Sequence, residues 1–343
     1  MSNQKHVVFR ADASSLIGGG HISRCLTLAN ALSERNWRCT FICSEQSVLA
    51  FPALGKAEHS LIILPDENRL EPIIDLPFGQ ADLLVIDHYE LGFEFEKDTR
   101  RWANSILVIE DMPTRKHDCD FLLDQTLGRS CEEYLGFVPI NTHLLLGPKY
   151  ALLKSDFSVA REGITKSQRQ GEIRKILVSI GGSDPKDITS TALMAIDTAG
   201  LDVEVDVVLG GESPNLSVVK ALVAHLGAKY KLHIDTTKMS VLMSAADLAI
   251  GACGVTSWER CSVSLPAIAV VIADNQRQIA QSLSDKGAIV YAGDWTELSV
   301  SLLAKLLVDL ASSREIMKSM SLRAGEVCDG QGVNRLLREL TDL

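Results

Sequence analysis

The sequence predicts an α/β protein made of two doubly wound, Rossmann-like domains that face a cleft. Short apolar runs alternate with longer segments of helical periodicity along the chain, which is the pattern of successive βαβ units. A polar segment interrupts the pattern near the middle, after which the pattern restarts. The 343 residues, 46% of them hydrophobic, are enough to form two buried cores.

The runs that predict strands are mostly apolar throughout, as expected of parallel strands covered on both faces. In the first half they span residues 6–10, 39–43, 61–64, 83–87, 106–110 and 121–124. In the second half they span residues 175–180, 203–209, 230–234, 248–251, 267–271 and 288–291. A glycine turn and a helix follow the first strand of each half, so the halves share an architecture without a sequence repeat.

Residues 154–175 are polar and lack an apolar period, which predicts a linker between domains. We therefore place the domains at residues 1–155 and 172–343, with the last helix free to pack back on the first domain. Polar side chains that follow strands of such domains should meet in the cleft, because parallel strands end at a common edge.

Charge and composition narrow the class of partner. The net charge of −10 and the absence of a basic run disfavour nucleic acid. No apolar stretch is long enough for a membrane span, and the chain begins without a signal region. The eight cysteines form no CxxC pair, which predicts reduced, mostly buried thiols in a cytoplasmic protein. The oligomeric state stays open, and a monomer is compatible with the sequence.

The first glycine turn is the main candidate site. Gly18, Gly19, Gly20 and His21 join the strand at residues 6–10 to a helix over about residues 21–31. Glycines permit a tight turn and a close ligand, and a helix N-terminus favours an anion. Histidine adds a group able to move a proton near neutral pH. The alternative interpretation makes His21 a helix-cap residue without chemistry.

Other polar residues follow predicted strands of the first half. They are Asp12, then Asp87, His88 and Tyr89, then Glu110 and Asp111, and finally Asp124 and Gln125. We expect all of them to point toward one crevice. Aspartates at strand ends also cap loops, so a purely structural role is the competing interpretation.

The second half carries its own ligand-binding pattern. After the strand at residues 248–251, glycines lead into a helix that Thr256 or Ser257 is expected to cap, with hydroxyls available to a diphosphate. Glu259 is placed to accept hydrogen bonds from ribose hydroxyls, and the alternative is a solvated glutamate. Asn275 and Gln276 follow another strand and are candidates for reading sugar hydroxyls.

The sequence does not predict a metal or a cofactor. Asp118 and Asp120 have an Asp-x-Asp spacing after His117, but they precede a strand and should lie away from the cleft. No HExxH or His/Cys metal motif is present.

Taken in order, these motifs resemble the UDP-2,4-diacetamido-2,4,6-trideoxy-β-L-altropyranose hydrolases of pseudaminic acid biosynthesis, and the likeness covers nearly the whole chain. Three residues depart from those more common in that family: Gly19, Ile22 and Ser23. We expect these differences to adjust the shape of the sugar pocket in this chain. The motifs that carry the resemblance are Arg10, Ala11, Asp12, Ala13, Ser14, Ser15; residues 18–21 and 24–29; Asp87, His88, Tyr89; Glu110, Asp111; residues 118–125, 146–153, 181–184, 254–260 and 273–276.

The resemblance implies a GT-B-like fold and metal-independent hydrolysis of a UDP-sugar with inversion at C1, with His21 as the general base. It implies that the second domain binds UDP. The substrate-binding residues that follow are Arg10, Asp12, Gly19, Gly20, Tyr89, Asn275 and Gln276. The UDP-binding residues are Gly181, Gly182, Ser183, Met239, Gly254, Thr256, Ser257 and Glu259.

Two other functions remain open on the sequence. One is a GT-B glycosyltransferase that passes the sugar to a true acceptor, and the other is a non-catalytic nucleotide-sugar binding protein. A dehydrogenase is disfavoured because the glycine spacing differs from the dinucleotide-binding pattern.

Overall fold

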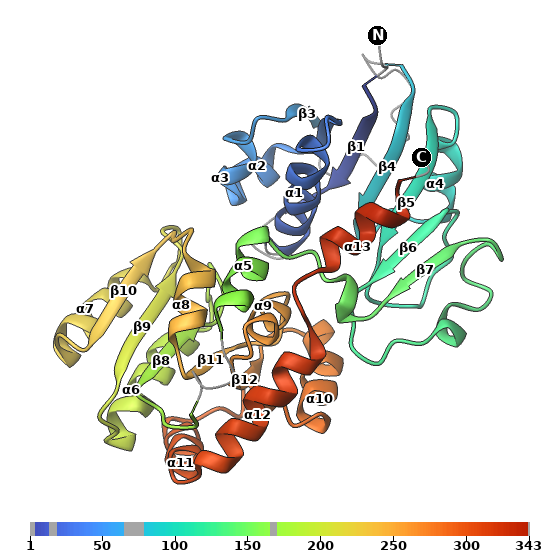
Figure 1. The fold of residues 1–343 in the computed structure, drawn as a ribbon. Coiled ribbons are helices and arrows are strands. Elements are labelled where there is room, and N and C mark those ends of the chain that lie inside the picture. The colour runs from blue at the N-terminus through green and yellow to red at the C-terminus, as the bar shows by residue number, and fades with distance from the viewer. Residues whose placement is uncertain (1–3, 14–18, 65–78, 165–169, 342–343) are drawn as a thin grey trace. The chain divides into compact units, whose positions relative to one another are not determined.

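The computed structural model describes residues 4–13, 19–64, 79–164 and 170–341. The chain forms two compact units, one of Met1–Leu153 with Gln331–Leu343 and the other of Lys154–Gly330 (Figure 1). Among the described residues, no helix combines the length and the apolar character needed to cross a membrane.

A parallel sheet of seven strands, in the order β3-β2-β1-β4-β5-β6-β7, forms the centre of the first unit. The sheet order changes direction between β1 and β4, which is where doubly wound folds bind ligands. The strands are β1 (His6–Ala11), β2 (Arg38–Ser44), β3 (Ser60–Leu64), β4 (Ala81–Asp87), β5 (Ala103–Ile109), β6 (Phe121–Asp124) and β7 (His143–Leu146).

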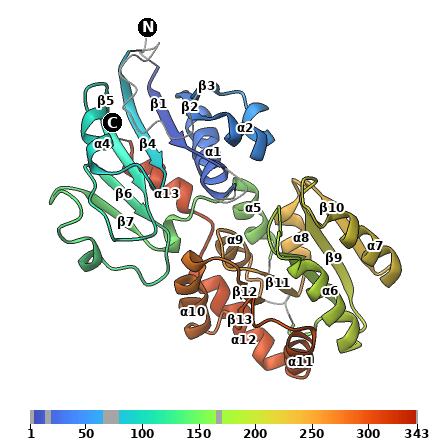
Figure 2. The ribbon, with the colours of Figure 1, turned by 180° about the vertical axis from the view of Figure 1, so that it is seen from behind.

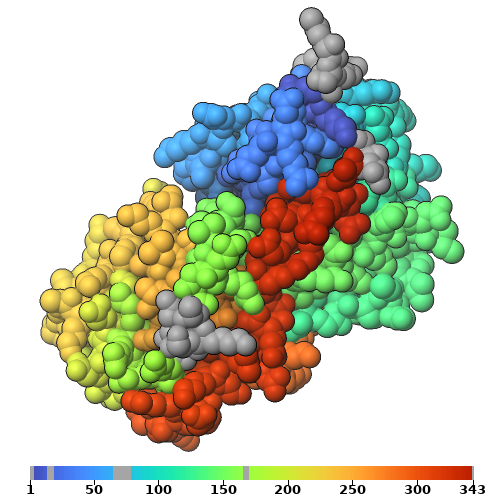
Figure 3. Space-filling model, in the orientation of Figure 1, coloured from blue at the N-terminus to red at the C-terminus, as the bar shows by residue number. Residues whose placement is uncertain are grey.

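Helices cover this sheet on both faces. Phe9 packs with residues of α1 and α13 on one face, and Val8 packs with residues of α4 on the other. The C-terminal α13 is seen in red against the first unit in Figure 3. The helices of this unit are α1 (Gly20–Ser33), α2 (Glu45–Ala50), α3 (Pro52–Gly55), α4 (Phe93–Thr99), η1 (Cys131–Tyr134), η2 (Pro148–Tyr150) and α13 (Gly332–Glu339).

The second unit has a parallel sheet of six strands in the order β10-β9-β8-β11-β12-β13. The strands are β8 (Lys175–Ser179), β9 (Glu204–Leu209), β10 (Tyr230–Ile234), β11 (Leu248–Ala252), β12 (Ala267–Val271) and β13 (Ile289–Asp294).

Helices α6 and α11 pack together and share one core with this sheet (Figure 2). The helices of the second unit are α5 (Ser155–Gly163), α6 (Ile188–Ala199), α7 (Leu216–Leu226), α8 (Met239–Ala245), α9 (Thr256–Ser262), η3 (Asp274–Gln276), α10 (Arg277–Asp285), α11 (Val300–Ala311) and α12 (Arg314–Val327).

Every strand predicted from the sequence is present, within a few residues of its predicted bounds. Strand β7, whose sequence is His-Leu-Leu-Leu, was not predicted. The prediction of unpaired, mostly buried cysteines is confirmed, since all are free and all but Cys131 are buried.

The prediction of a linker over residues 154–175 is wrong for its first part, which forms α5 in the second unit. Phe157 is buried there, although the surrounding sequence is polar. Arg161 donates hydrogen bonds of 2.8–3.0 Å to three backbone carbonyls, those of Ser262, Gly325 and Cys328. One buried ring and one arginine therefore anchor a helix that has little apolar periodicity.

Candidate active site

The first strand–helix turn brings together His21, Arg24 and Asp87. His21 and Arg24 lie on α1, one turn apart, and Asp87 is the last residue of β4. Asp87 accepts a hydrogen bond from His21 Nδ1, and Arg24 donates from Nε at 2.5 Å and from Nη2 at 2.6 Å. All three side chains are buried. The prediction of His21 as a helix cap is excluded, because α1 already begins at Gly20.

Electrostatics fix the charge of this cluster. Burial alone would raise the pKa of Asp87, but the charges and hydrogen bonds of Arg24 and His21 outweigh burial and hold this pKa well below its usual range. Burial would likewise lower the pKa of Arg24, and Asp87 raises it instead. Because the carboxylate can only accept, His21 Nδ1 carries a proton, and in the neutral ring Nε2 is therefore the nitrogen with the lone pair.

Tyr89 lies directly beside this histidine. The two rings make an edge-on contact, with centroids 4.8 Å apart and planes 88° apart. The Tyr89 hydroxyl donates to Asp111 Oδ2 at 3.1 Å. Asp111 Oδ1 is buried and has no hydrogen-bond partner among the described residues, and burial is the main cause that raises the pKa of this carboxyl.

A second carboxylate, Asp12, gathers polar groups at the end of β1. Its oxygens accept from Arg10 Nη1 at 2.6 Å, from the Ser44 amide at 2.7 Å and from the Ser47 hydroxyl at 2.9 Å. His88 Nε2 lies 3.2 Å from Asp12 Oδ2. The predicted crevice residues of β1, β4 and β5 therefore meet at one edge of the sheet, whereas Asp124 is engaged by Arg129 and Tyr134.

Gly19 has a packing reason to be glycine. A Cβ atom at this position would lie 2.7 Å from the ring of Phe51, so the side chain is excluded by the protein itself. Gly20 is the first residue of α1. Gly18 lies outside the described residues, as do Ser14 and Ser15.

In the second unit, the prediction that Thr256 or Ser257 caps the helix is wrong. Helix α9 begins at Thr256 after Val255, without a side-chain cap. Arg260 occupies these hydroxyls, donating to Ser257 Oγ at 3.1 Å and to Thr256 Oγ1 at 3.4 Å. The Arg260 guanidinium also takes the space that a side chain at Gly251 would need, so this glycine serves internal packing.

Glu259 is partly exposed beside this buried arginine. Burial raises the pKa of Glu259 to about 7, and the charges of Lys154 and Arg260 oppose the shift only in part. A solvated glutamate, the alternative interpretation, would show no such shift.

The remaining predicted residues of the second unit lie at four places, each following a strand of its sheet. Gly182 and Ser183 are exposed after β8, and Gly181 is partly so. The Asp184 carboxylate, at the end of that turn, accepts the amides of Ile188 and Thr189 and so already occupies the N-terminus of α6. After β12, Gln276 Oε1 accepts the Ile272 amide at 3.1 Å, and the neighbouring Asn275 is exposed. Met239 is the first residue of α8, and Gly254 lies between β11 and α9.

The Asp-x-Asp motif is engaged internally. Asp118 and Asp120 both pair with Arg100, and His117 is buried between Glu96 and Glu110. Within the ranges that the structure describes, no three ligating side chains are grouped to hold a metal ion.

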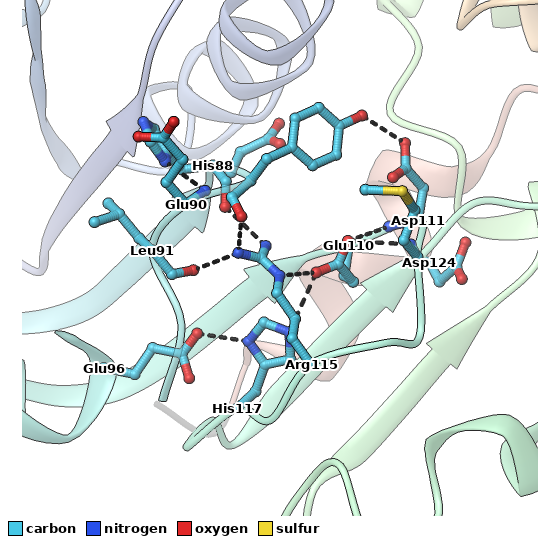
Figure 4. A network of polar contacts seen from close by, with 12 residues as sticks. His88, Glu90, Leu91, Glu96, Glu110, Asp111, Arg115, His117 and Asp124 are labelled. Atoms are coloured by element: carbon cyan, nitrogen blue, oxygen red, sulfur yellow. Dashed lines mark hydrogen bonds and ion pairs between the residues drawn. The ribbon is translucent and has the colours of Figure 1, made fainter. Parts of the chain in front are cut away.

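Several arginines of these clusters were not singled out from the sequence, among them Arg24, Arg260 and Arg115, which pairs with Glu110. Arg24 could have been noticed as a charge on the apolar face of its helix, one turn from His21. Arg260 likewise lies one turn from Thr256. Arg115 stands in a polar loop, where the sequence carries no signal of its role (Figure 4).

Several known proteins are similar to this chain in sequence. Residues 176–332 match the glycosyltransferase family 28 C-terminal domain. The chain is 27% identical to the spore coat polysaccharide biosynthesis protein SpsG of Bacillus subtilis, over 98% of both chains. It is 25% identical to the UDP-2,4-diacetamido-2,4,6-trideoxy-beta-L-altropyranose hydrolase of Campylobacter jejuni, over 82% of this chain and 97% of that one.

The fold is also that of a solved structure. The crystal structure of Acinetobacter baumannii MurG matches with a TM-score of 0.65 at 14% identity, covering 99% of this chain and 100% of that chain. The two units are therefore Rossmann-like domains of the GT-B-like type. The resemblance to the hydrolase family is supported by the Campylobacter relative, and the matches together support an enzyme of nucleotide-sugar chemistry.

Proposed function

We propose that the protein hydrolyses a UDP-linked 2,4-diacetamido-2,4,6-trideoxyhexose to the free sugar and UDP, as a step of pseudaminic acid biosynthesis. The observation that carries the proposal is the pairing of His21 with the ionised Asp87. It leaves one ring nitrogen able to accept a proton, and the Campylobacter relative is named for this reaction.

In the proposed reaction, His21 Nε2 takes one proton from a water molecule as the water oxygen attacks C1 of the sugar. The bond from C1 to the diphosphate oxygen breaks, and its electron pair leaves with UDP. Attack opposite the leaving group inverts C1. Asp87 keeps the imidazole in the required tautomer and stabilises the imidazolium that forms. No metal is needed for this step, because UDP is a good leaving group once its charge is stabilised.

The second unit supplies that stabilisation in the proposal. A guanidinium only donates, so the hydroxyls that accept from Arg260 keep their own protons for a diphosphate oxygen. Glu259 accepts from the ribose hydroxyls. The further UDP contacts are assigned to Gly181, Gly182, Ser183, Met239 and Gly254, and the sugar contacts to Arg10, Asp12, Gly19, Gly20, Tyr89, Asn275 and Gln276.

The test is UDP release from the UDP-diacetamido-trideoxyhexose in the absence of any acceptor. The natural chain should release UDP from all of the substrate. His21→Asn should lose about 10²- to 10⁴-fold in kcat and still bind UDP in calorimetry. His143→Asn, which changes an exposed histidine of the same unit, is the matched control. In water enriched in oxygen-18, the label should enter the sugar at C1. Label in UDP, or equal turnover by H21N, would contradict the proposal.

A glycosyltransferase that uses the same donor is the second candidate. The family 28 domain match and the higher identity to the spore coat polysaccharide protein favour it. The two candidates differ in their need for an acceptor. A transferase releases UDP slowly from the donor alone and accelerates when the acceptor glycan is added, whereas a hydrolase does not.

A further inference from the structure

The loop that follows β4 carries the two residues His88 and Tyr89, and a single arginine holds its backbone. We propose that Arg115 is a positioning residue of the reaction, which fixes this loop so that the Tyr89 ring stays against His21. This inference rests on the proposed function, since it assigns the group that orders the sugar end of that site.

Arg115 contacts three carbonyls of the loop at once. Its Nη1 donates to the carbonyls of Tyr89 and Leu91, the latter at 3.0 Å, and its Nη2 donates to that of His88 at 2.8 Å (Figure 4). The planar fork of a guanidinium can serve several acceptors in fixed directions, and the single ammonium of lysine cannot. The loop backbone is therefore held by geometry as well as by charge.

Glu110 anchors the arginine from the end of β5. Its Oε2 accepts from Arg115 Nε at 2.7 Å, and its Oε1 accepts the Asp111 amide at 2.9 Å. Asp111 in turn accepts the Tyr89 hydroxyl. Tyr89 is thus held at two points, at its carbonyl by Arg115 and at its phenol by Asp111. Arg115 and the Asp111 amide both donate to the buried carboxylate of Glu110.

The far end of the loop is fixed through the same carboxylate. His117 Nε2 lies 3.2 Å from Glu110 Oε2, and its Nδ1 lies 2.6 Å from Glu96 on α4. Both ring nitrogens face carboxylates, so both carry protons. Burial would lower the pKa of His117, but its hydrogen bonds to Glu110 and Glu96 outweigh burial and raise it. The segment from His88 to Glu96 therefore has little freedom to move Tyr89.

The decisive variant is Arg115→Lys, with Arg100→Lys as its control. Arg100 is also a partly buried arginine of the first unit that pairs with two carboxylates, Asp118 and Asp120, but it does not touch this loop. We expect R115K to lower kcat by about 10- to 100-fold, because misplacement of a site by about 1 Å costs on that order. UDP affinity should not change, and R100K should stay within about twofold of the natural chain.

A double-mutant cycle with Tyr89→Ala tests whether the arginine acts through the tyrosine. In the Y89A background, R115K should cost almost nothing further. An equal fold-loss in both backgrounds would overturn the proposal, as would a loss in R100K as large as that in R115K. Should R115K not fold, Glu110→Gln removes the charge of the anchor at constant shape and is expected to act in the same direction.

Hydrogen exchange separates this inference from the proposed reaction. The amides of residues 88–91 should exchange faster in R115K than in R100K, at matched thermal stability and with no substrate present. Unchanged exchange would overturn the positioning role even in an active hydrolase. Faster exchange in a protein that hydrolyses nothing would support the positioning role and reject the proposed function alone.

Discussion

Asp87 accepts a hydrogen bond from Nδ1 of His21, although 66 positions separate them in the sequence. The contact joins the end of β4 to the first turn of α1, two elements that the parallel sheet brings to one edge. Arg24 completes the arrangement by donating to both oxygens of the carboxylate. A buried cation, a buried anion and a histidine with one free nitrogen are the parts of an oriented general base.

Replacing Asp87 by Asn should abolish that orientation. The amide can donate to His21 Nδ1, which moves the ring proton to Nε2 and removes the base. We expect kcat for acceptor-free UDP release to fall by about 10²- to 10⁴-fold, with UDP affinity unchanged in calorimetry. Asp98→Asn, a change at an exposed ion pair with Arg101, is the control. Equal activity of D87N and the natural chain would remove Asp87 from the mechanism.

The meeting of these groups was predictable from the sequence only in part. His21 and Asp87 each follow an apolar strand, and the rule that parallel strands end at one edge brings them together. Arg24 was not predicted: its place on the apolar face of the helix signals a buried charge, but the sequence does not say which carboxylate it pairs with. The partner comes from another strand and is fixed only by the tertiary fold.

In the second unit, the local pattern was predicted correctly, but the expected helix cap was wrong. The strand, the turn and the start of α9 follow from the sequence, as do hydroxyls at its first positions. Their engagement by Arg260, one turn later, decides what they do. The same guanidinium fills the space that a side chain at Gly251 would need.

The buried carboxylate at the end of β1 predicts an acid-sensitive first unit. Burial would raise the pKa of Asp12, but its hydrogen bond to His88, the Arg10 charge and the Ser44 amide hold it well below its usual value. As pH falls below about 5, the unfolded chain binds this proton first, so the stability that Asp12 contributes is lost on acidification.

Urea unfolding at pH 7 and pH 3 measures this effect. The natural chain should lose about 1 kcal/mol more of its free energy of unfolding between these values than Asp12→Asn does, because an aspartate of the unfolded chain is mostly protonated at pH 3. Asp82→Asn is the matched control, since this aspartate of β4 accepts the backbone amide of His6, outside the Asp12 cluster. A natural chain and a D12N variant with the same pH dependence would show that Asp12 does not contribute in this way.

The two hydroxyls at the start of α9 should contribute to UDP binding. Each accepts from Arg260 and keeps a proton for a diphosphate oxygen. Removing both in Thr256→Ala/Ser257→Ala should weaken UDP binding by about 10²- to 10⁴-fold, because each hydrogen bond to a charged group contributes about 1.5–3 kcal/mol. Calorimetry with UDP is the measurement. Ser244→Ala, which removes a hydroxyl bonded only within α8, should bind normally; weakening in both variants alike would point to a general loss of folding.

Glu259 should make UDP affinity depend on pH near neutrality. Burial raises the pKa of its carboxyl to about 7, so about a tenth of the chains carry the carboxylate at pH 6 and about nine tenths at pH 8. If the ionised form accepts the ribose hydroxyls, the apparent affinity should rise about tenfold between these values, in proportion to the competent fraction. The phosphates of UDP titrate near pH 6 as well, so Glu259→Gln must be measured alongside. The glutamine variant retains the phosphate contribution and loses that of the carboxyl. A pH dependence of the same size in both proteins would show that the nucleotide alone causes the effect and that Glu259 does not bind the ribose.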